Sequence, residues 1–153
     1  MSSSITWRNR YLNLAKHIST WSKDPSRQIG AVAVGSKGEI LAQGFNGFPR
    51  GIYDTDYRLA YREEKYKYVV HAEMNVIYNA SFNGVSLDGA DLYVYGLPVC
   101  NECAKGIIQV GVKRVFILTS GSNSVPDMWI ESWNNSKSMF DEVGIDYIWM
   151  YDE

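Results

Sequence analysis

The chain has 153 residues, 46% of them hydrophobic and 14% aromatic, which is enough for one sizeable core and too little for two ordinary domains. A formal net charge of -2 provides no large basic field to draw the chain onto nucleic acid, so no nucleic-acid partner is expected. There is no signal-peptide pattern and no apolar run of membrane-spanning length. We expect a single domain over residues 1–153 that has no membrane association and is located in the cytoplasm, where both cysteines stay reduced.

Apolar residues near the start of the chain recur at three- and four-residue steps from Trp7 to Trp21, which indicates a helix that ends before Pro25. Two aliphatic runs follow, Ile29 to Val34 and Ile40 to Phe45, and the glycine-containing segment between them predicts an antiparallel hairpin. The segment from Arg50 to Lys67 is polar, charged and rich in tyrosine without a clean period. We interpret it as a long loop with a helical turn in it, of a kind that is usually functional or mobile.

The rest of the chain alternates between helical and extended patterns. We expect helices over residues 71–80, 103–110 and 129–143, with Gly111 as the cap of the second, and strands over residues 92–95, 115–118 and 147–150. Trp129 and Trp133, four residues apart, are expected to cover the sheet. A hairpin followed by alternating strands and helices predicts an α/β fold, a three-layer α-β-α sandwich around a mixed sheet of about five strands.

Two short motifs carry candidate chemistry. His71-Ala72-Glu73 opens one expected helix, Cys100-Asn101-Glu102-Cys103 opens the next, and a strand lies between them. The free amides and the positive dipole end at a helix start stabilise anions such as thiolates. If the strand returns the chain to the same edge of the sheet, the His71 imidazole and the thiolates of Cys100 and Cys103 meet at one point. Three protein ligands with one open position are typical of a catalytic zinc site.

The remaining residues support a catalytic rather than a structural zinc. A structural site would need a fourth ligand, and the one other histidine, His17, lies in the first expected helix. Glu73 follows His71 closely enough to take a proton from a water whose pKa zinc has lowered, and to pass it on to a reacting group. Each motif alone is weak, because His-x-Glu occurs by chance and Cys-x-x-Cys also serves as a redox pair or in a zinc knuckle. Their combination in this order is far more specific.

These residues, with Pro98 shortly before Cys100, resemble the signature H-x-E followed by P-C-x-x-C of the cytidine and deoxycytidylate deaminase superfamily. Further segments are similar to its deoxycytidylate (dCMP) deaminase branch, and the likeness runs from about Trp7 to Leu118. These segments are Ser22-Lys23-Asp24-Pro25, Ile29-Gly30-Ala31, Gly44-Phe45-Asn46-Gly47-Phe48-Pro49-Arg50-Gly51, His71-Ala72-Glu73-Met74-Asn75 and Ile107-Ile108-Gln109-Val110-Gly111-Val112.

The resemblance implies a cytidine deaminase-like fold and the hydrolysis of dCMP to dUMP with release of ammonia, on one Zn²⁺ per chain. The metal ligands would be His71, Cys100 and Cys103, and Glu73 would move the protons. The resemblance also implies that Asn46 faces the sugar and that the main chain at Ala72 meets the edge of the base.

The same resemblance implies regulation by nucleoside triphosphates, with dCTP as activator and dTTP as inhibitor, usually accompanied by Mg²⁺. The regulatory site would lie near contacts within a homo-oligomer, a hexamer by family resemblance. Phe45, Gly47 and Arg50 are the residues expected at it.

Two features depart from the family pattern. The proline that usually stands just before the first cysteine appears one place early, as Pro98, and Val99 takes its position, which costs some preorganisation of the helix start but removes no ligand. Many relatives carry a second zinc in an insertion before the His-Ala-Glu segment. No cysteine occurs between Arg50 and Tyr68, so we expect one zinc per chain.

A nucleotide phosphate needs cationic or amide donors. Ser22, Lys23 and Arg27, in the loop before the first expected strand, are the candidates, and a solvated surface loop is the alternative interpretation of all three. The cations of the tyrosine-rich segment are alternative candidates for binding phosphate: Arg50, Arg58, Arg62 and Lys65.

Two other functions stay open at this point. A zinc deaminase that acts on a base in RNA or DNA would use the same chemistry, but the acidic balance of the chain disfavours it. A non-catalytic, zinc-stabilised binding module would have no use for the carboxylate of Glu73.

Overall fold

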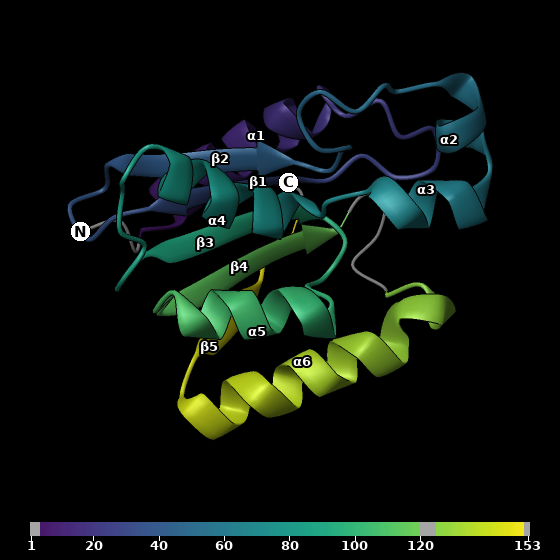
Figure 1. Cartoon of the computed structure of the whole chain (residues 1–153). Coiled ribbons are helices and arrows are strands. Elements are labelled where there is room, and N and C mark those ends of the chain that lie inside the picture. The colour runs from purple at the N-terminus through teal and green to yellow at the C-terminus, as the bar shows by residue number, and fades with distance from the viewer. Residues whose placement is uncertain (1–3, 120–124, 152–153) are drawn as a thin grey trace.

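The computed structural model describes residues 4–119 and 125–151, and within them one sheet of five strands is covered by helices on both faces (Figure 1). The strands are β1 (Gly30–Val34), β2 (Ile40–Phe45), β3 (Asp91–Gly96), β4 (Arg114–Thr119) and β5 (Asp146–Trp149). The helices are α1 (Ile5–Ser19), α2 (Asp56–Ala60), α3 (Arg62–Tyr68), α4 (Ala72–Phe82), α5 (Asn101–Gln109) and α6 (Ile130–Val143), with a 3-10 turn η1 (Asp127–Trp129) ahead of α6.

The sheet is mixed and has the order β2-β1-β3-β4-β5. Strand β1 is antiparallel to both β2 and β3, whereas β3, β4 and β5 are parallel to one another. Parallel neighbours need crossover connections, and α5 and α6 supply them between β3 and β4 and between β4 and β5. The predicted hairpin and the predicted mixed five-stranded sheet are confirmed.

The side chains of each strand alternate between two cores, one on each face of the sheet, as expected for a period of two residues. Helix α1 covers one face, and α4, α5 and α6 cover the other (Figure 1). The core under α1 includes Tyr11, Leu12, Val32, Val34, Tyr93 and Phe116. The core on the opposite face includes Ala31, Ala33, Val76, Leu92, Val94, Ile107, Val115, Ile117 and Phe140. The three-layer α-β-α sandwich is therefore the architecture of the chain.

Helix α4 rests directly on β2 at Gly44. A Cβ atom at this glycine would lie 2.7 Å from the carbonyl oxygen of Ala72 and 2.6 Å from the amide nitrogen of Val76, which is closer than non-bonded atoms pack. Glycine permits this close approach of helix and strand backbones. The first turn of α4, and with it His71 as the residue that caps the helix, is thus held against the end of β2.

The segment between β2 and α4 corrects the sequence interpretation, because it contains two short helices rather than a long loop with one helical turn. The Thr55 hydroxyl accepts a hydrogen bond from the amide of Arg58 and caps α2, and α3 begins with Glu63 and Glu64, which suit the positive end of a helix dipole. No residue of α2 is buried, and α3 buries Lys65. An apolar stripe, the signal that periodicity detects, is therefore missing from both helices.

The other boundaries lie within about three residues of the predicted ones. Helix α5 begins at Asn101 rather than at Cys103, and Gly111 follows its end with a positive φ of 86°. No helix within the described residues has the length and apolar character that crossing a membrane requires.

Candidate metal centre and active-site cavity

Three loops meet at one edge of the sheet because of the register of β1. Gly30, at the start of β1, is paired with Phe45 at the end of β2 and with Tyr95 near the end of β3. The loop that precedes β1 and the loops that follow β2 and β3 therefore leave the sheet side by side. An isolated bridge between Gly47 and Val70 brings the start of α4 to the same edge.

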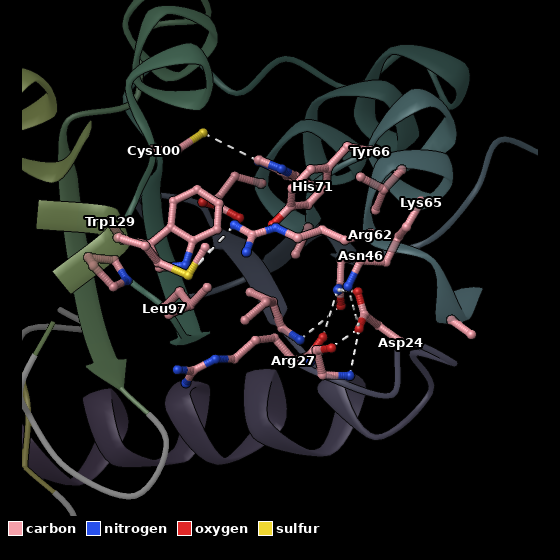
Figure 2. Close-up of a pocket in the computed structure, with 18 residues that line it drawn as sticks. Asp24, Arg27, Asn46, Arg62, Lys65, Tyr66, His71, Leu97, Cys100 and Trp129 are labelled. Carbon is pink, nitrogen blue, oxygen red and sulfur yellow. Dashed lines mark hydrogen bonds and ion pairs between the residues drawn. The ribbon is translucent and has the colours of Figure 1, made fainter. Parts of the chain in front are cut away.

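Helices α4 and α5 each begin with a candidate metal ligand at this edge. His71 is the N-terminal cap residue of α4, and Cys100 is that of α5, where its sulfur accepts a hydrogen bond from the amide of Cys103. The Sγ atoms of Cys100 and Cys103 lie 3.3 and 3.4 Å from Nδ1 of His71. The three ligand atoms all lie within 4.8 Å of one another, and Figure 2 shows His71 and Cys100 directed toward each other.

This donor set fits zinc. Zinc forms bonds of about 2.0–2.3 Å to imidazole nitrogen and thiolate sulfur, so a single ion can reach three atoms with this spacing. Nitrogen and sulfur donors together also favour zinc over magnesium or calcium, which prefer oxygen. The convergence that the sequence predicted for His71, Cys100 and Cys103 is present in the fold.

The three ligands perturb one another strongly. The pKa of the Cys100 thiol falls to about 4, first because Cys103 hydrogen bonds to its sulfur and then because His71 does. The same hydrogen bond with Cys100, together with burial, raises the pKa of Cys103 far above its ordinary value. The hydrogen bond with Cys100 raises the pKa of His71 to about 9. Since zinc binds thiolates and neutral imidazole, metal uptake is expected to release protons from this cluster.

Glu73 lies in the first turn of α4, beside this cluster, and only 4% of its surface is exposed. Burial, and after it the negative charge of Cys100, raises the pKa of Glu73 to about 7, although the charge of His71 opposes this. A carboxyl group that exchanges its proton near neutral pH is suited to both accept and donate a proton during a reaction.

A cavity of about 250 Å³ opens in front of the metal ligands (Figure 2). His71, Ala72, Glu73 and Cys100 form one end of it, and a mixture of charged, amide, aromatic and aliphatic residues forms the remainder. These other lining residues include Asp24, Arg27, Ile29, Asn46, Arg62, Lys65, Tyr66, Leu97, Met128 and Trp129.

The cations of this cavity differ in what they bind. Lys65 is paired with Asp24 at 3.1 Å, and only 9% of each side chain is exposed. Arg62 packs its guanidinium 5.2 Å from the ring centre of Tyr66 and lies 3.8 Å from the sulfur of Met128. Within residues 4–119 and 125–151, neither Arg62 nor Arg27 forms an ion pair with a carboxylate. These two guanidinium groups are the cations available to an anionic ligand in this cavity.

Asn46 lines the cavity, but its side chain is used to hold the neighbouring loop. Its Oδ1 accepts a hydrogen bond from the amide of Ile29 at 2.9 Å, and its Nδ2 donates to the carbonyl of Arg27 at 2.8 Å. Ser22 is buried and donates to the carbonyl of Asn46, so it lies behind the cavity wall, while Lys23 pairs with Asp54 outside the cavity. Of the phosphate candidates in the loop before β1, Arg27 is the one that lines the cavity.

A second cavity, of about 270 Å³, lies next to the first, and the two share part of their lining. Phe45, Gly47 and Arg50, the three residues expected at a regulatory site, all line it, and Lys23 does so too. Four residues line both cavities: Asp24, Asn46, Lys65 and Val69.

Trp129 corrects another expectation from the sequence. Trp133 covers the sheet as predicted, with its ring edge-on to those of Tyr147 and Trp149, but Trp129 lines the cavity in front of the metal ligands. The two tryptophans differ because Trp129 belongs to η1, before α6 begins, so the helical spacing does not apply to it. Pro126, which stands directly before η1, is the one local signal of this break.

Comparisons with known proteins agree with this geometry. Residues 5–119 match the family model described as the cytidine and deoxycytidylate deaminase zinc-binding region. The chain is 39% identical to a probable deoxycytidylate deaminase of Drosophila melanogaster, over 94% of this chain and 71% of that protein. It is 38% identical to the deoxycytidylate deaminase of Homo sapiens, over 75% of this chain and 66% of that protein. The crystal structure of dCMP deaminase from cyanophage S-TIM5 superimposes with a TM-score of 0.74 at 25% identity and covers 96% of this chain and 99% of that one.

The chain therefore belongs to the cytidine and deoxycytidylate deaminase family. Membership in this family, together with a histidine and two cysteines placed to bind one metal ion, makes it an enzyme of the zinc-dependent nucleotide deaminase class.

Proposed function

We propose that this protein hydrolyses dCMP to dUMP and ammonia. One observation carries the proposal: two of the three metal ligands, His71 and Cys100, and the buried Glu73 form one end of a cavity that also contains two guanidinium groups without carboxylate partners among the described residues. Several relatives that are 37–39% identical are deoxycytidylate deaminases or probable ones, which supports the choice of substrate.

Zinc held by His71, Cys100 and Cys103 would lower the pKa of water and so supply a nucleophile at neutral pH. Glu73 accepts the proton that this water loses. It delivers this proton to the ring nitrogen. It then takes the second proton of the same water, from the hydroxyl group now on the ring carbon, and delivers it to the exocyclic amine, which leaves as ammonia. The raised pKa of Glu73 supports this role, because the group changes its protonation state near neutral pH.

The rest of the cavity orients the nucleotide. The main chain at Ala72, which is fully buried next to Glu73, meets the edge of the base. Arg27 and Arg62 bind the phosphate, because charged donors with no competing carboxylate are the strongest partners for an anion. Asn46 supports the sugar side of the cavity by fixing the loop that carries Arg27.

The second cavity is proposed as a regulatory site that takes dCTP as activator and dTTP as inhibitor, with Mg²⁺ accompanying the triphosphate. Phe45, Gly47 and Arg50 line it, in agreement with the family resemblance. The four residues that line both cavities form a shared wall. An effector that moves this wall in the second cavity also changes the shape of the substrate cavity. The proposed enzyme acts in the cytoplasm as a homo-oligomer, a hexamer by family resemblance.

Ammonia release from dCMP, CMP, cytidine and dCTP, measured in parallel with and without dCTP or dTTP as effector, tests these proposals. We expect the highest kcat/KM for dCMP, activation by dCTP and inhibition by dTTP. Equal rates on cytidine and on the monophosphates would contradict a phosphate-binding role for the cavity. Rates that do not respond to effectors would leave the reaction in place and contradict the regulatory site alone.

The two alternative functions are tested by other measurements. A deaminase of RNA or DNA would bind oligonucleotides, with an affinity that falls steeply as salt is added. We expect weak binding without deamination of cytosine in oligonucleotides. A binding module would take up zinc but release no ammonia from any of the four substrates.

A further inference from the structure

Helix α6 packs against α5 and forms a hydrogen bond with the loop that carries Cys100, although it lies beyond residues 5–119, which match the family model. Figure 1 shows α6 running beside α5 on the same face of the sheet. Two serines one helical turn apart, Ser132 and Ser136, make the polar contacts between α6 and this loop.

Ser132 binds the first residue of α5. Its hydroxyl accepts a hydrogen bond from the amide of Asn101 at 2.9 Å and donates one to the side-chain Oδ1 of the same residue at 2.7 Å. The first amides of a helix have no partner within the helix, so Ser132 satisfies a group that would otherwise need water. The position of Asn101, directly after the metal ligand Cys100, is thereby fixed.

Ser136 binds the residue on the other side of the ligand. Its hydroxyl lies 2.8 Å from the carbonyl oxygen of Val99, and both residues are fully buried. The hydroxyl also lies 3.1 Å from the carbonyl of Ser132, which keeps it oriented along the helix. A buried carbonyl that loses its donor cannot recruit water easily, so this contact is costly to remove.

We propose that Ser132 and Ser136 are positioning residues for the metal centre, which hold Cys100 in place by binding the residues before and after it. The inference rests on the metal centre of the proposed function. Zinc dissociates when one ligand moves away from it, and a rotation of the backbone at Cys100 is one movement that withdraws its sulfur. With Val99 and Asn101 both attached to α6, that rotation is restrained, and zinc is released more slowly.

Zinc transfer from the zinc-loaded protein to an excess of chelator tests the inference directly. Removal of groups that support metal ligands typically lowers metal affinity about 10- to 100-fold. If this loss appears in the dissociation rate, we expect Ser132→Ala to accelerate zinc release roughly 10-fold and Ser136→Ala up to about 100-fold. Ser132→Thr keeps the hydroxyl and should restore the slow release. The cobalt-loaded protein gives a second readout, since loosening of Cys100 should weaken its sulfur-to-cobalt absorption bands.

Two control variants on α6 separate positioning from stability. Ser138 is exposed, and Ser138→Ala should release zinc at the rate of the parent protein. Phe140→Leu weakens the buried packing of α6 against Tyr147 and leaves both serine hydroxyls in place, so it should lower the unfolding midpoint but not accelerate zinc release.

The outcomes distinguish a positioning role of the two serines from a general effect on stability. Unchanged zinc release from Ser132→Ala and Ser136→Ala would overturn the positioning role, and so would equal acceleration by Phe140→Leu. If Ser136→Ala fails to fold, the comparison of Ser132→Ala with Ser132→Thr still decides the matter. A parent protein that binds no zinc would instead contradict the metal centre itself.

Discussion

Lys65 of α3 and Asp24, in the loop before β1, form an ion pair in the wall between the two cavities, 41 residues apart in the chain. Asp24 also accepts hydrogen bonds from the amides of Ser26 and Arg27 through the same oxygen. The pair therefore connects α3 to the loop that carries one of the proposed phosphate ligands.

Removal of one member of this pair should destabilise the protein strongly. Lys65→Met leaves the Asp24 carboxylate buried without its cation, a change that costs about 3 kcal/mol. For a chain of this size we expect the thermal unfolding midpoint to fall by roughly 6 to 12 °C. Lys67→Met is the matched control on the same helix, because Lys67 pairs with Glu64 in contact with solvent and its loss should leave the midpoint nearly unchanged. Equal midpoints for the two variants would contradict a structural role for the buried pair.

Glu73→Gln tests the proton carrier without changing the shape of the site. The amide cannot accept and return a proton, so kcat should fall by about 10²- to 10⁴-fold, while zinc content and fold stay unchanged. Glu102→Gln, at an exposed carboxylate between the two cysteines, should retain full activity. Near-normal turnover of Glu73→Gln would refute the assigned role.

The two histidines provide a matched pair for the metal site. His71→Ala should abolish stoichiometric zinc binding, measured by metal analysis of the purified protein, whereas His17→Ala changes an exposed residue of α1 and should retain one zinc per chain. In the parent protein, zinc at 100 times its dissociation constant should stabilise the fold by about 2.7 kcal/mol, so a chelator should lower the unfolding midpoint. A full zinc complement in His71→Ala would show that the ligand set is wrong.

Arg62→Gln tests the recognition of phosphate. Loss of a hydrogen bond to a charged group costs about 1.5–3 kcal/mol, so kcat/KM for dCMP should fall roughly 10- to 100-fold. The slower reaction of deoxycytidine, which has no phosphate, should be almost unaffected. Arg10→Gln, on the exposed part of α1, is the control for a general change of charge. A similar loss on both substrates would indicate that Arg62 supports the cavity and does not bind phosphate.

The metal site could be predicted from the sequence because its three ligands lie in two short motifs, each at the start of a helix. A single strand, β3, separates these helices and returns the chain to the same edge of the sheet. The two motifs and the strand between them were therefore sufficient to predict that the ligands converge. The same holds for the hairpin and for the sheet, whose strands show clear aliphatic runs.

The cavity wall could not be predicted in this way, since its members meet only through tertiary packing. Lys65 and Asp24 come from segments whose pairing no periodicity encodes, and Trp129 reaches the cavity from the turn η1, in the connection between β4 and β5. Ser22 shows the opposite case: its position in the loop before the first expected strand made it a candidate for binding phosphate, whereas in the fold its hydroxyl donates a hydrogen bond to the carbonyl of Asn46.

The contact of Gly44 with α4 means that a position outside the active site should tolerate few substitutions. A Cβ atom at this position would lie 2.6–2.9 Å from backbone atoms of α4, so alanine would force the first turn of α4 to shift and to carry His71 and Glu73 with it. A saturation screen scored by deamination should therefore rank Gly44 among the least replaceable positions, although it touches neither metal nor nucleotide. New substrate specificity on this fold would have to arise from changes in the loops around the cavity, because the distance between β2 and α4 at Gly44 cannot increase without moving His71 and Glu73.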